Sequence, residues 1–291
     1  MAIDKLQDRI RKMKSPIALD LFAQEEHIPP CFFREEKSFL CAYEAYSLRL
    51  LDALKDSVAA IRMDYGMLSL YGSDGLRVMG EISIQAHKLG YYVLLQIPEP
   101  LSFRSAECEA NILFSSDAPV YFDGILLSAC IGSDAISPFA DHLKESGKDL
   151  FIVSRTSNRS AAELQDLRSG SRLAYLAKAD IVKRYADDLV GKYGYSRVAL
   201  VAAASSVDCL RTLRNKYANL FLLLDGCDYP NANAKNCAAA FDKLGYGAIS
   251  CAGLSVMAAW KTEGTETEYI ESAVKAVERH KRNILRYVTV L

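Results

Sequence analysis

The sequence predicts an α/β protein that forms a closed (β/α)8 barrel, or TIM barrel, in a single domain over residues 1–291. Eight short apolar runs alternate with longer amphipathic segments along the chain. The runs are rich in Val, Ile and Leu and do not alternate with polar residues, as expected for parallel strands buried on both faces. Eight strand–helix units favour a barrel, and an open doubly wound sheet is the second choice.

Eight strands are predicted along the chain. They cover 16–20 (PIALD), 58–63 (VAAIRM), 91–96 (YYVLLQ), 123–128 (DGILLS), 149–154 (DLFIVS), 197–203 (RVALVAA), 219–225 (NLFLLLD) and 246–251 (YGAISC). The predicted irregular segments are 21–35, 98–104, 155–160 and 226–236. In a barrel, chemistry takes place where the strands end and these connections begin.

Helical periodicity fills the intervals between the strands. Apolar residues recur at every third or fourth position in one segment: Met79, Ile82, Ala86 and Leu89. This spacing predicts one face of a helix, which Gly90 ends. The same spacing runs from Ile270 to Val277. We expect an N-terminal helix over 1–14 and a C-terminal helix over 264–291.

Composition excludes several classes of protein. Lys plus Arg number 35 and Asp plus Glu number 36, so no charge bias indicates a nucleic-acid partner or a membrane surface. The eight cysteines are scattered without a CxxC pair, and there are only four histidines, so we predict no metal and no cofactor. A reduced, cytoplasmic protein is the simplest interpretation. The N-terminal stretch MAIDKLQDRIRKMK is charged throughout, unlike a signal peptide, and no apolar run approaches the roughly 18 residues of a membrane span.

Several segments in order carry a family resemblance. They are SPIALD (15–20), LLDALKDSVAAIRMDYGMLSLYGSDGL (50–76), IGSDAISPF (131–139), RTSNRSAAELQDL (155–167) and LDGCDYPNA (224–232). Together they resemble orotidine 5′-monophosphate decarboxylase, in its longer bacterial subfamily, from residue 1 to about residue 260. The resemblance implies the barrel fold, a homodimer and a nucleotide-like small-molecule ligand.

The resemblance also implies where catalytic groups belong. The family uses an alternating Lys-Asp-Lys-Asp array: a Lys ends the second strand, and an Asp-x-Lys-x-x-Asp motif ends the third. A nearby ammonium stabilises the carbanion left by loss of CO2 and then protonates it. In this sequence Arg62 replaces the first Lys, and the motif positions hold Gln96, Pro98 and Leu101. Arginine does not deprotonate in proteins and is a poor acid, so we predict that no catalytic group of the family is intact.

The phosphate end of the family's site is also changed. The family binds its 5′-phosphate through a Gly-rich loop after the seventh strand and an Arg after the eighth. Gly226 is kept here, but the loop adds Asp225 and Asp228 and places Pro230 where a glutamine belongs; the Arg position holds Leu254. Each carboxylate beside a phosphate opposes binding by roughly 1 to 4 kcal/mol at about 4 Å. We therefore predict weak or absent nucleotide affinity, with Lys235 as a compensating cation that the sequence does not place.

The remaining candidate binding residues each have two interpretations. Asp20 either contacts a ribose-like hydroxyl or caps the next loop, and Arg62 either binds an anion or pairs with Asp20 or Asp64. Thr156, Ser157 and Asn158 either read an amide-bearing ring or only shape their loop and cap the helix begun at Ala161 and Ala162. Pro98-Glu99-Pro100 is either a partner-binding loop or the result of sequence drift after loss of a constraint. Cys130, Cys227 and Cys251 are either thiol nucleophiles or structural thiols. His27 is either a functional histidine or a solvated loop residue.

Three functional hypotheses follow. The first is a catalytically degenerate homologue that acts in binding or regulation. The second is an enzyme with changed chemistry that uses Arg62, Asp20, Glu99 or Asp225 on a substrate lacking a phosphate. The third is an active orotidine 5′-monophosphate decarboxylase, a lyase of pyrimidine biosynthesis. Pro98 and Leu101 fit the third hypothesis least.

Overall fold

A closed parallel barrel forms the centre of the molecule. The computed structural model describes residues 1–21, 24–36, 38–229 and 231–291. In these residues eight strands close in the order β1-β2-β3-β4-β5-β8-β9-β10, and β10 pairs with β1. The strands are β1 (Ile17–Leu21), β2 (Ala60–Asp64), β3 (Tyr92–Gln96), β4 (Gly124–Leu127), β5 (Asp149–Val153), β8 (Val198–Ala203), β9 (Leu222–Asp225) and β10 (Ala248–Ala252). The predicted (β/α)8 barrel is therefore confirmed, and the open sheet is not.

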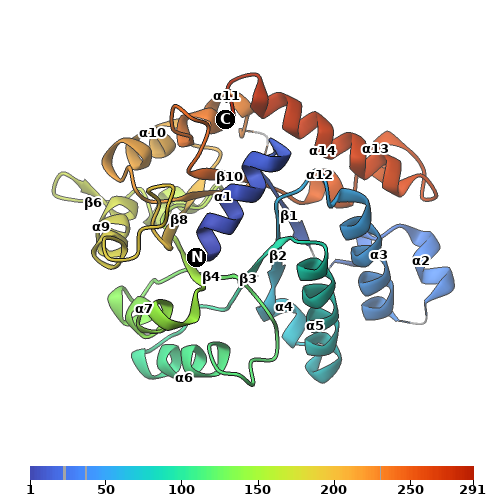
Figure 1. Cartoon of the computed structure of the whole chain (residues 1–291), viewed down its shortest axis with the longest axis horizontal. Helices are drawn as coiled ribbons and strands as arrows, with labels where there is room; N and C mark the ends of the chain where they lie inside the picture. The colour runs from blue at the N-terminus through green and yellow to red at the C-terminus, as the bar shows by residue number, and fades with distance from the viewer. Residues whose placement is uncertain (22–23, 37, 230) are drawn as a thin grey trace.

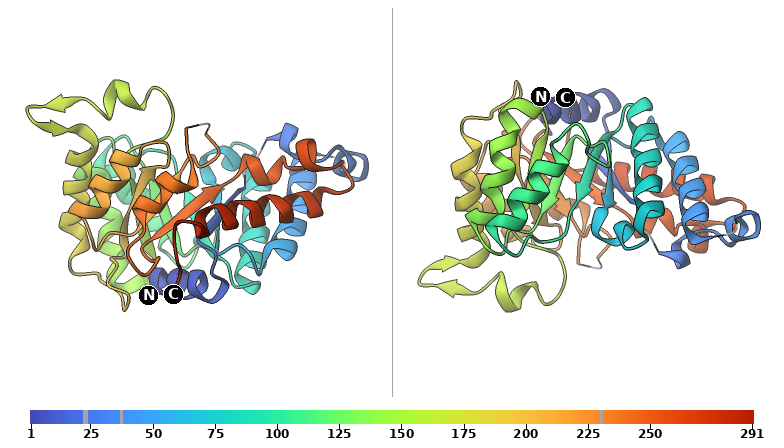
Figure 2. Two further views of the ribbon diagram at one scale, coloured as in Figure 1. Left: turned by 90° about the horizontal axis from the view of Figure 1, so that it is seen from above. Right: turned by 90° about the horizontal axis from the view of Figure 1, so that it is seen from below.

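Helices surround this barrel (Figure 1). They are α1 (Ala2–Met13), α2 (Pro30–Glu35), α3 (Phe39–Leu54), α4 (Tyr65–Ser69), α5 (Gly72–Lys88), α6 (Phe103–Leu113), α7 (Ser133–Ser146), α8 (Ala161–Leu164), α9 (Ala174–Ala186), α10 (Val207–Lys216), α11 (Ala234–Cys237), α12 (Leu254–Met257), α13 (Trp260–Glu263) and α14 (Tyr269–Leu285), with short 3-10 turns η1 (Glu25–His27) and η2 (Ala238–Ala240). A small hairpin of β6 (Arg168–Ser169) and β7 (Arg172–Leu173) projects from the side of the barrel in Figure 2.

The two ends of the chain meet at the amino ends of the strands. Figure 2 places both termini beside α1. Arg9 of α1 donates to the carbonyls of Lys55 and Leu89, which precede β2 and β3. Arg11 donates to the Leu291 carbonyl at 3.1 Å. Helix α1 thus closes the end of the barrel opposite the candidate site, because chemistry in this fold occurs at the carboxyl ends.

Several predicted boundaries differ from the structure. Three predicted strands began two or three residues early, at 58, 219 and 246, because the residues just before these strands are also apolar and buried. The predicted irregular segment 21–35 is wrong in part, since η1 and α2 lie within it. The C-terminal helix ends at Leu285 rather than at residue 291. After it, the chain turns back, and the Leu291 amide donates to the Leu244 carbonyl at 3.2 Å.

Candidate ligand site at the barrel mouth

A cavity of about 670 Å³ opens at the carboxyl ends of the strands. It lies where the sequence predicts chemistry, and its size is typical of small-molecule sites. Its charged lining residues are Asp20, Arg62, Asp64, Asp225 and Asp228. Within the described lining, four carboxylates thus face a single cation. Apolar side chains such as Ile97, Val153 and Val201 supply much of the remaining wall.

Arg62 lies between two carboxylates from neighbouring strands. The parallel register sets Arg62 of β2 beside Asp20 of β1. Arg62 donates to both Asp20 oxygens, from Nε at 2.7 Å and from Nη2 at 2.6 Å. Its Nη1 donates to Asp225 Oδ1 at 2.8 Å. The structure supports the pairing interpretation of Arg62. Its partners are Asp20 and Asp225. Asp64, the other partner considered from the sequence, does not pair with it in the described residues. The sequence did not reveal Asp225 as a partner, because β9 lies far from β2 along the chain.

Burial controls the ionisation of this cluster. The Asp20 side chain is 9 % exposed and that of Arg62 is 11 % exposed. Loss of solvation raises the pKa of Asp20 to about 6, although Arg62 acts in the opposite direction. The nearby carboxylates of Asp225 and Asp228 raise it further. The pKa of Arg62 is raised above its usual value because, despite burial, the carboxylates around it favour the cation. The guanidinium therefore stays charged at every pH at which the fold persists.

The third strand carries no charge into the cavity. Gln96 lines it and donates from Nε2 to Asp64 Oδ2 at 3.1 Å. Asp64 also accepts the Met67 amide at 3.0 Å, as the N-terminal cap of α4. Pro98 and Leu101 lie on the loop beyond β3, and the Leu101 side chain is exposed to solvent (82 %). Glu99 turns away and accepts a hydrogen bond from the Cys130 amide.

The loop after β5 uses most of its polar groups internally. Thr156 Oγ1 bonds with Asn158 and Gln165, and Asn158 Nδ2 donates to Ser160 Oγ at 2.8 Å. Ser157 Oγ donates to the Asp225 carbonyl at 2.6 Å. Among the three predicted ring-contacting residues, Thr156 lines the cavity, while Ser157 and Asn158 shape the loop. This arrangement favours the structural interpretation for two of the three.

The loop after β9 approaches the β5 loop closely. Gly226 lines the cavity with a φ of +73°, and a Cβ there would lie 2.4 Å from the Ser157 Cβ. Asp228 accepts the Gly253 amide at 2.8 Å, which turns its carboxylate toward the segment after β10. Leu254 lines the cavity at the family's Arg position. Pro230 lies outside the described residues.

Lys235 does not compensate for these carboxylates. It lines a separate pocket on the side of the barrel, not the mouth. No other lysine is present among the described residues that line the mouth. The mouth is therefore acidic.

One expectation about a histidine needs correction, and a second histidine was missed. His27 was predicted to be either functional or a solvated loop residue, but it is buried, at 5 % exposed, and burial lowers its pKa. The sequence did not single out His280. His280 of α14 nevertheless bonds Ser250 Oγ at 2.8 Å, and Ser250 bonds Cys227 Sγ at 3.0 Å. Sequence spacing could not reveal this chain, because its members lie on three distant segments.

The mouth thiols are not poised as nucleophiles. Cys251 is buried, and loss of solvation together with the Asp20 carboxylate raises its pKa. The pKa of Cys227 is also raised, chiefly by a hydrogen bond with Cys237 and by burial. Cys130 is exposed and does not line the mouth. Protonated thiols are weak nucleophiles, so Cys227 and Cys251 fit the structural interpretation.

Known proteins of similar sequence support the family resemblance. The chain is 24 % identical over 288 residues to orotidine 5′-phosphate decarboxylase of Clostridium novyi, covering 98 % of this chain and 99 % of that protein. It is 25 % identical over 294 residues to the protein of the same name from Clostridium tetani, covering 99 % of each. This chain is therefore similar to orotidine 5′-phosphate decarboxylases over nearly its whole length. No protein-family model matches it.

Solved structures of orotidine 5′-monophosphate decarboxylases share the fold. The Plasmodium berghei enzyme superposes with a TM-score of 0.78 at 13 % identity, covering 98 % of this chain and 97 % of that one. The Leishmania donovani enzyme gives 0.70 at 19 % identity, covering 97 % and 99 %. At these identities the superpositions establish the shared barrel only.

The described residues offer neither a metal site nor a membrane-spanning helix. In 1–21, 24–36, 38–229 and 231–291, no group of three or more His, Cys, Asp or Glu side chains could hold a metal ion. Over the same ranges, every helix is too short or too polar to cross a membrane.

Proposed function

We propose that this chain is a catalytically degenerate member of the orotidine 5′-phosphate decarboxylase family that binds a small ligand without a phosphate group at the barrel mouth. The observation that carries the proposal is the state of Arg62. It is the only cation in the described lining of the mouth, and two carboxylates already pair with it. A neutral, partly apolar ligand fits such a cavity better than a nucleotide.

The decarboxylation chemistry of the family has no carrier at this mouth. Stabilising a carbanion requires a nearby cation, and protonating it requires an acid whose proton can leave. Arg62 keeps its proton, and its charge is balanced by Asp20 and Asp225. Gln96, Pro98 and Leu101 supply neither a charge nor a proton. The role of the mouth is therefore binding.

Charge at the mouth also opposes a phosphate. Asp225 and Asp228 stand on the loop that would hold it, and Leu254 supplies no positive charge. Repulsion of roughly 1 to 4 kcal/mol per carboxylate at about 4 Å weakens binding of a dianion by about one to three orders of magnitude. Uridine should thus bind at least as well as UMP, the reverse of the order expected for a phosphate-dependent site.

The test is decarboxylation of orotidine 5′-monophosphate at high enzyme concentration, followed by the ultraviolet change, with calorimetric titration of UMP and uridine alongside. We expect no turnover and no heat from UMP. Turnover that Arg62→Ala abolishes would overturn the proposal, because it would mean that the arginine stabilises the carbanion. A Leu164→Ala variant, changed at an exposed site away from the mouth, serves as the control.

The names of the relatives favour a second candidate, an active orotidine 5′-phosphate decarboxylase. Proteins of that name align with nearly the whole length of this chain. The same assay decides between the candidates, since turnover that persists after purification supports the second. A third candidate is an enzyme acting on a substrate without a phosphate; Asp20 favours it, because a carboxyl with a pKa of about 6 can exchange a proton near neutral pH.

We also propose a homodimer formed through the loops after β2 and β3. Leu70 and Leu101 are 86 % and 82 % exposed, which is unusual for leucines on neighbouring loops. The two loops touch, since a Cβ at Gly66 would lie 3.1 Å from Pro98. Sedimentation should show a dimer that Leu70→Asp/Leu101→Asp dissociates and that Leu164→Asp, at a distant exposed leucine, leaves intact. A monomeric parent protein would refute this assembly.

The remaining proposals concern organisation and location. We propose that residues 1–291 fold as one barrel domain, since α1 and the C-terminal segment pack against each other. We propose a cytoplasmic location on the basis of the eight cysteines, all of which are free thiols.

A further inference from the structure

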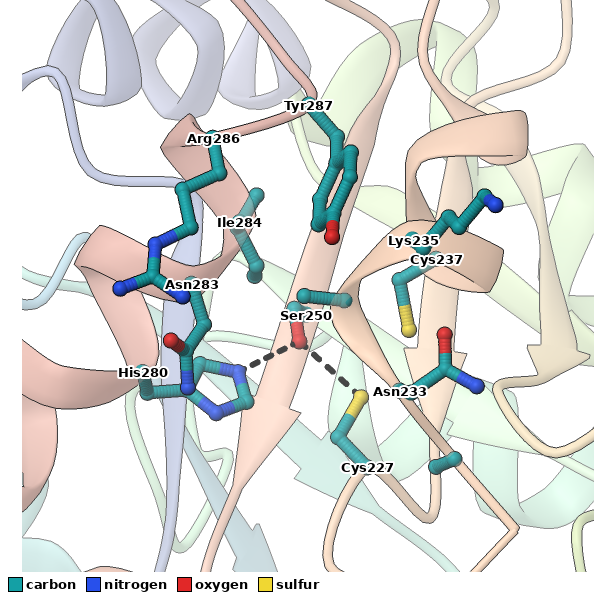
Figure 3. A pocket seen from close by; sticks show the side chains of 12 residues that line it. Cys227, Asn233, Lys235, Cys237, Ser250, His280, Asn283, Ile284, Arg286 and Tyr287 are labelled. Atoms are coloured by element: carbon teal, nitrogen blue, oxygen red, sulfur yellow. Dashed lines mark hydrogen bonds between the residues drawn. The ribbon is translucent and has the colours of Figure 1, made fainter.

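A second pocket lies on the side of the barrel, between α11 and the carboxyl end of α14 (Figure 3). We call it the flank pocket; its volume is about 570 Å³. Its polar lining residues are Asn233, Lys235, Ser250, His280, Asn283, Arg286 and Tyr287. Figure 3 shows side chains from α14 on one wall and from the 233–237 segment on the other.

The flank pocket is separate from the barrel mouth. Successive residues of a strand point to opposite faces. Cys251 of β10 lines the mouth, so its neighbour Ser250 points outward to the helices, where it lines the flank pocket. Cys227 lines both cavities and is the one residue common to their described linings. The chain after β9 therefore contributes Gly226, Asp228 and Tyr229 to the mouth and Asn233, Lys235 and Cys237 to the flank pocket.

The charge of the flank pocket is opposite to that of the mouth. Lys235 and Arg286 line it, and no Asp or Glu does among the described residues. Neither cation forms an ion pair within the part of the chain that the structure describes, whereas Arg62 in the mouth forms two. Two cations at the edge of one cavity make the potential there positive, which suits a negatively charged group.

The inner wall of the pocket is polar but uncharged. Ser250 Oγ joins His280 Nε2 at 2.8 Å and Cys227 Sγ at 3.0 Å, as the dashed lines of Figure 3 show. Burial lowers the pKa of His280 and contributes to raising that of Cys227, so both groups are neutral near pH 7. The Asn233 and Asn283 amides and the Tyr287 hydroxyl add hydrogen-bond donors. The Asp228 carboxylate is near enough to act on His280, but no Asp or Glu belongs to the described lining of the pocket.

We propose that the flank pocket is a second binding site, for a small anionic ligand that carries a phosphate or carboxylate group. Lys235 and Arg286 lie on opposite walls with their charged ends directed away from each other (Figure 3), so each pairs with an anionic group at its own side of the pocket. The amides, Tyr287 and the Ser250–His280 pair contact the remainder of the ligand. The flank pocket lies on the other side of the loop that borders the mouth. The proposal of a second site therefore does not depend on whether the mouth binds a ligand.

The test is calorimetric titration with inorganic phosphate and with citrate at low ionic strength, where screening is weak. We expect one site for at least one probe. Lys235→Gln/Arg286→Gln should weaken its binding about tenfold or more, because two favourable charge pairs are removed. The matched control is Lys275→Gln/Arg282→Gln, which removes two exposed charges of α14 outside the pocket. The affinity of this control for the probe should stay within about twofold of the parent's.

A second pair of variants guards against a general charge effect. Asn283→Asp adds a carboxylate to the pocket with almost no change in volume, and Asn111→Asp adds one at a distant exposed site. Only the first should weaken binding. Binding of phosphate alone identifies a phosphorylated ligand, and binding of citrate alone identifies a carboxylate. The proposal is overturned if neither probe binds, or if the pocket variants and their controls lose affinity equally.

Discussion

The Arg62 guanidinium faces the Asp20 carboxylate edge to edge, with two hydrogen bonds of 2.6 and 2.7 Å between neighbouring strands. A third bond of 2.8 Å joins Arg62 to Asp225. In a decarboxylase of this family, a lysine with carboxylate neighbours takes part in the chemistry. In this chain the equivalent cation is locked in a nearly buried ion pair. The predictions below test what this arrangement and its surroundings do.

Removing the cation should destabilise the fold strongly. Arg62→Gln leaves the buried Asp20 carboxylate facing Asp225 without a partner, which costs about 3 to 5 kcal/mol in the free energy of unfolding. Urea denaturation measures this loss. The double variant Arg62→Gln/Asp20→Asn should recover part of it, because the uncompensated charge is gone. A loss below about 1 kcal/mol in the single variant would show that the pair contributes little.

The raised pKa of Asp20 makes stability depend on pH. The folded protein binds a proton at Asp20 more tightly than the unfolded chain, whose pKa is near 3.8. The Asp20 contribution to stability is therefore full below about pH 4 and is lost as the pH rises to about 6. The shift of about two units corresponds to a loss of about 3 kcal/mol.

This dependence can be isolated by comparing variants. Between pH 4 and pH 7, the parent protein should lose more stability than Asp20→Asn, because the contributions of other groups cancel in the difference. Carbon-13 NMR of the Asp20 carboxyl should show a midpoint near pH 6. A midpoint below pH 4 would mean that the Arg62 guanidinium lowers the pKa of Asp20 more than burial raises it.

Gly226 should not tolerate a side chain. Its φ of +73° strains any other residue, and a Cβ would also lie 2.4 Å from the Ser157 Cβ. Gly170→Ala is the matched control, since Gly170 has a φ of +63° but nothing lies within 4 Å of its Cβ position. We expect thermal or urea unfolding to show a loss of about 1 to 2 kcal/mol for the control and a clearly larger loss for Gly226→Ala. Equal losses would show that the loop after β5 moves aside.

A positive charge at the mouth should increase phosphate affinity. Leu254→Arg/Asp228→Asn adds a cation at the position where the family has an arginine and removes a carboxylate from the phosphate loop. Calorimetry should detect UMP binding to this variant, at an affinity about tenfold or more above the upper limit for the parent. Leu244→Arg/Asp228→Asn is the control, because Leu244 is 47 % exposed, like Leu254 at 46 %, but lies outside the mouth lining. Equal UMP affinity in both variants would mean that a cation at position 254 does not contribute to phosphate binding.

The barrel strands were predictable because each is a short apolar run, and such a run forms a buried strand in this fold. A run such as VALVAA becomes β8, buried at every position, whichever neighbours it pairs with. The strand ends at Asp20, Gln96 and Asp225 likewise line the mouth as predicted. Boundaries were less predictable, because Leu220 and Phe221 before β9 are as apolar and as buried as the strand.

Pairings between distant elements could not be predicted in the same way. Arg62 had several carboxylates as candidate partners, and only closure of the barrel brings Asp225 to it. Lys235 was a possible compensating cation that the sequence could not place, and the structure places it on the lining of the flank pocket. His280 lies on a helix after the last strand, and α14 packing against β10 places it beside Ser250.

The sequence by itself determined the barrel, the order of its strands and the uncharged residues Gln96, Pro98 and Leu101 at and after the end of β3. Those features depend on residue type and local periodicity, which the chain carries wherever it folds. Only the tertiary structure decided that Arg62 is paired, that the mouth is acidic and that two free cations face another pocket. Charge acts through space over a few ångströms, and the distances that matter here join strands and helices far apart along the chain.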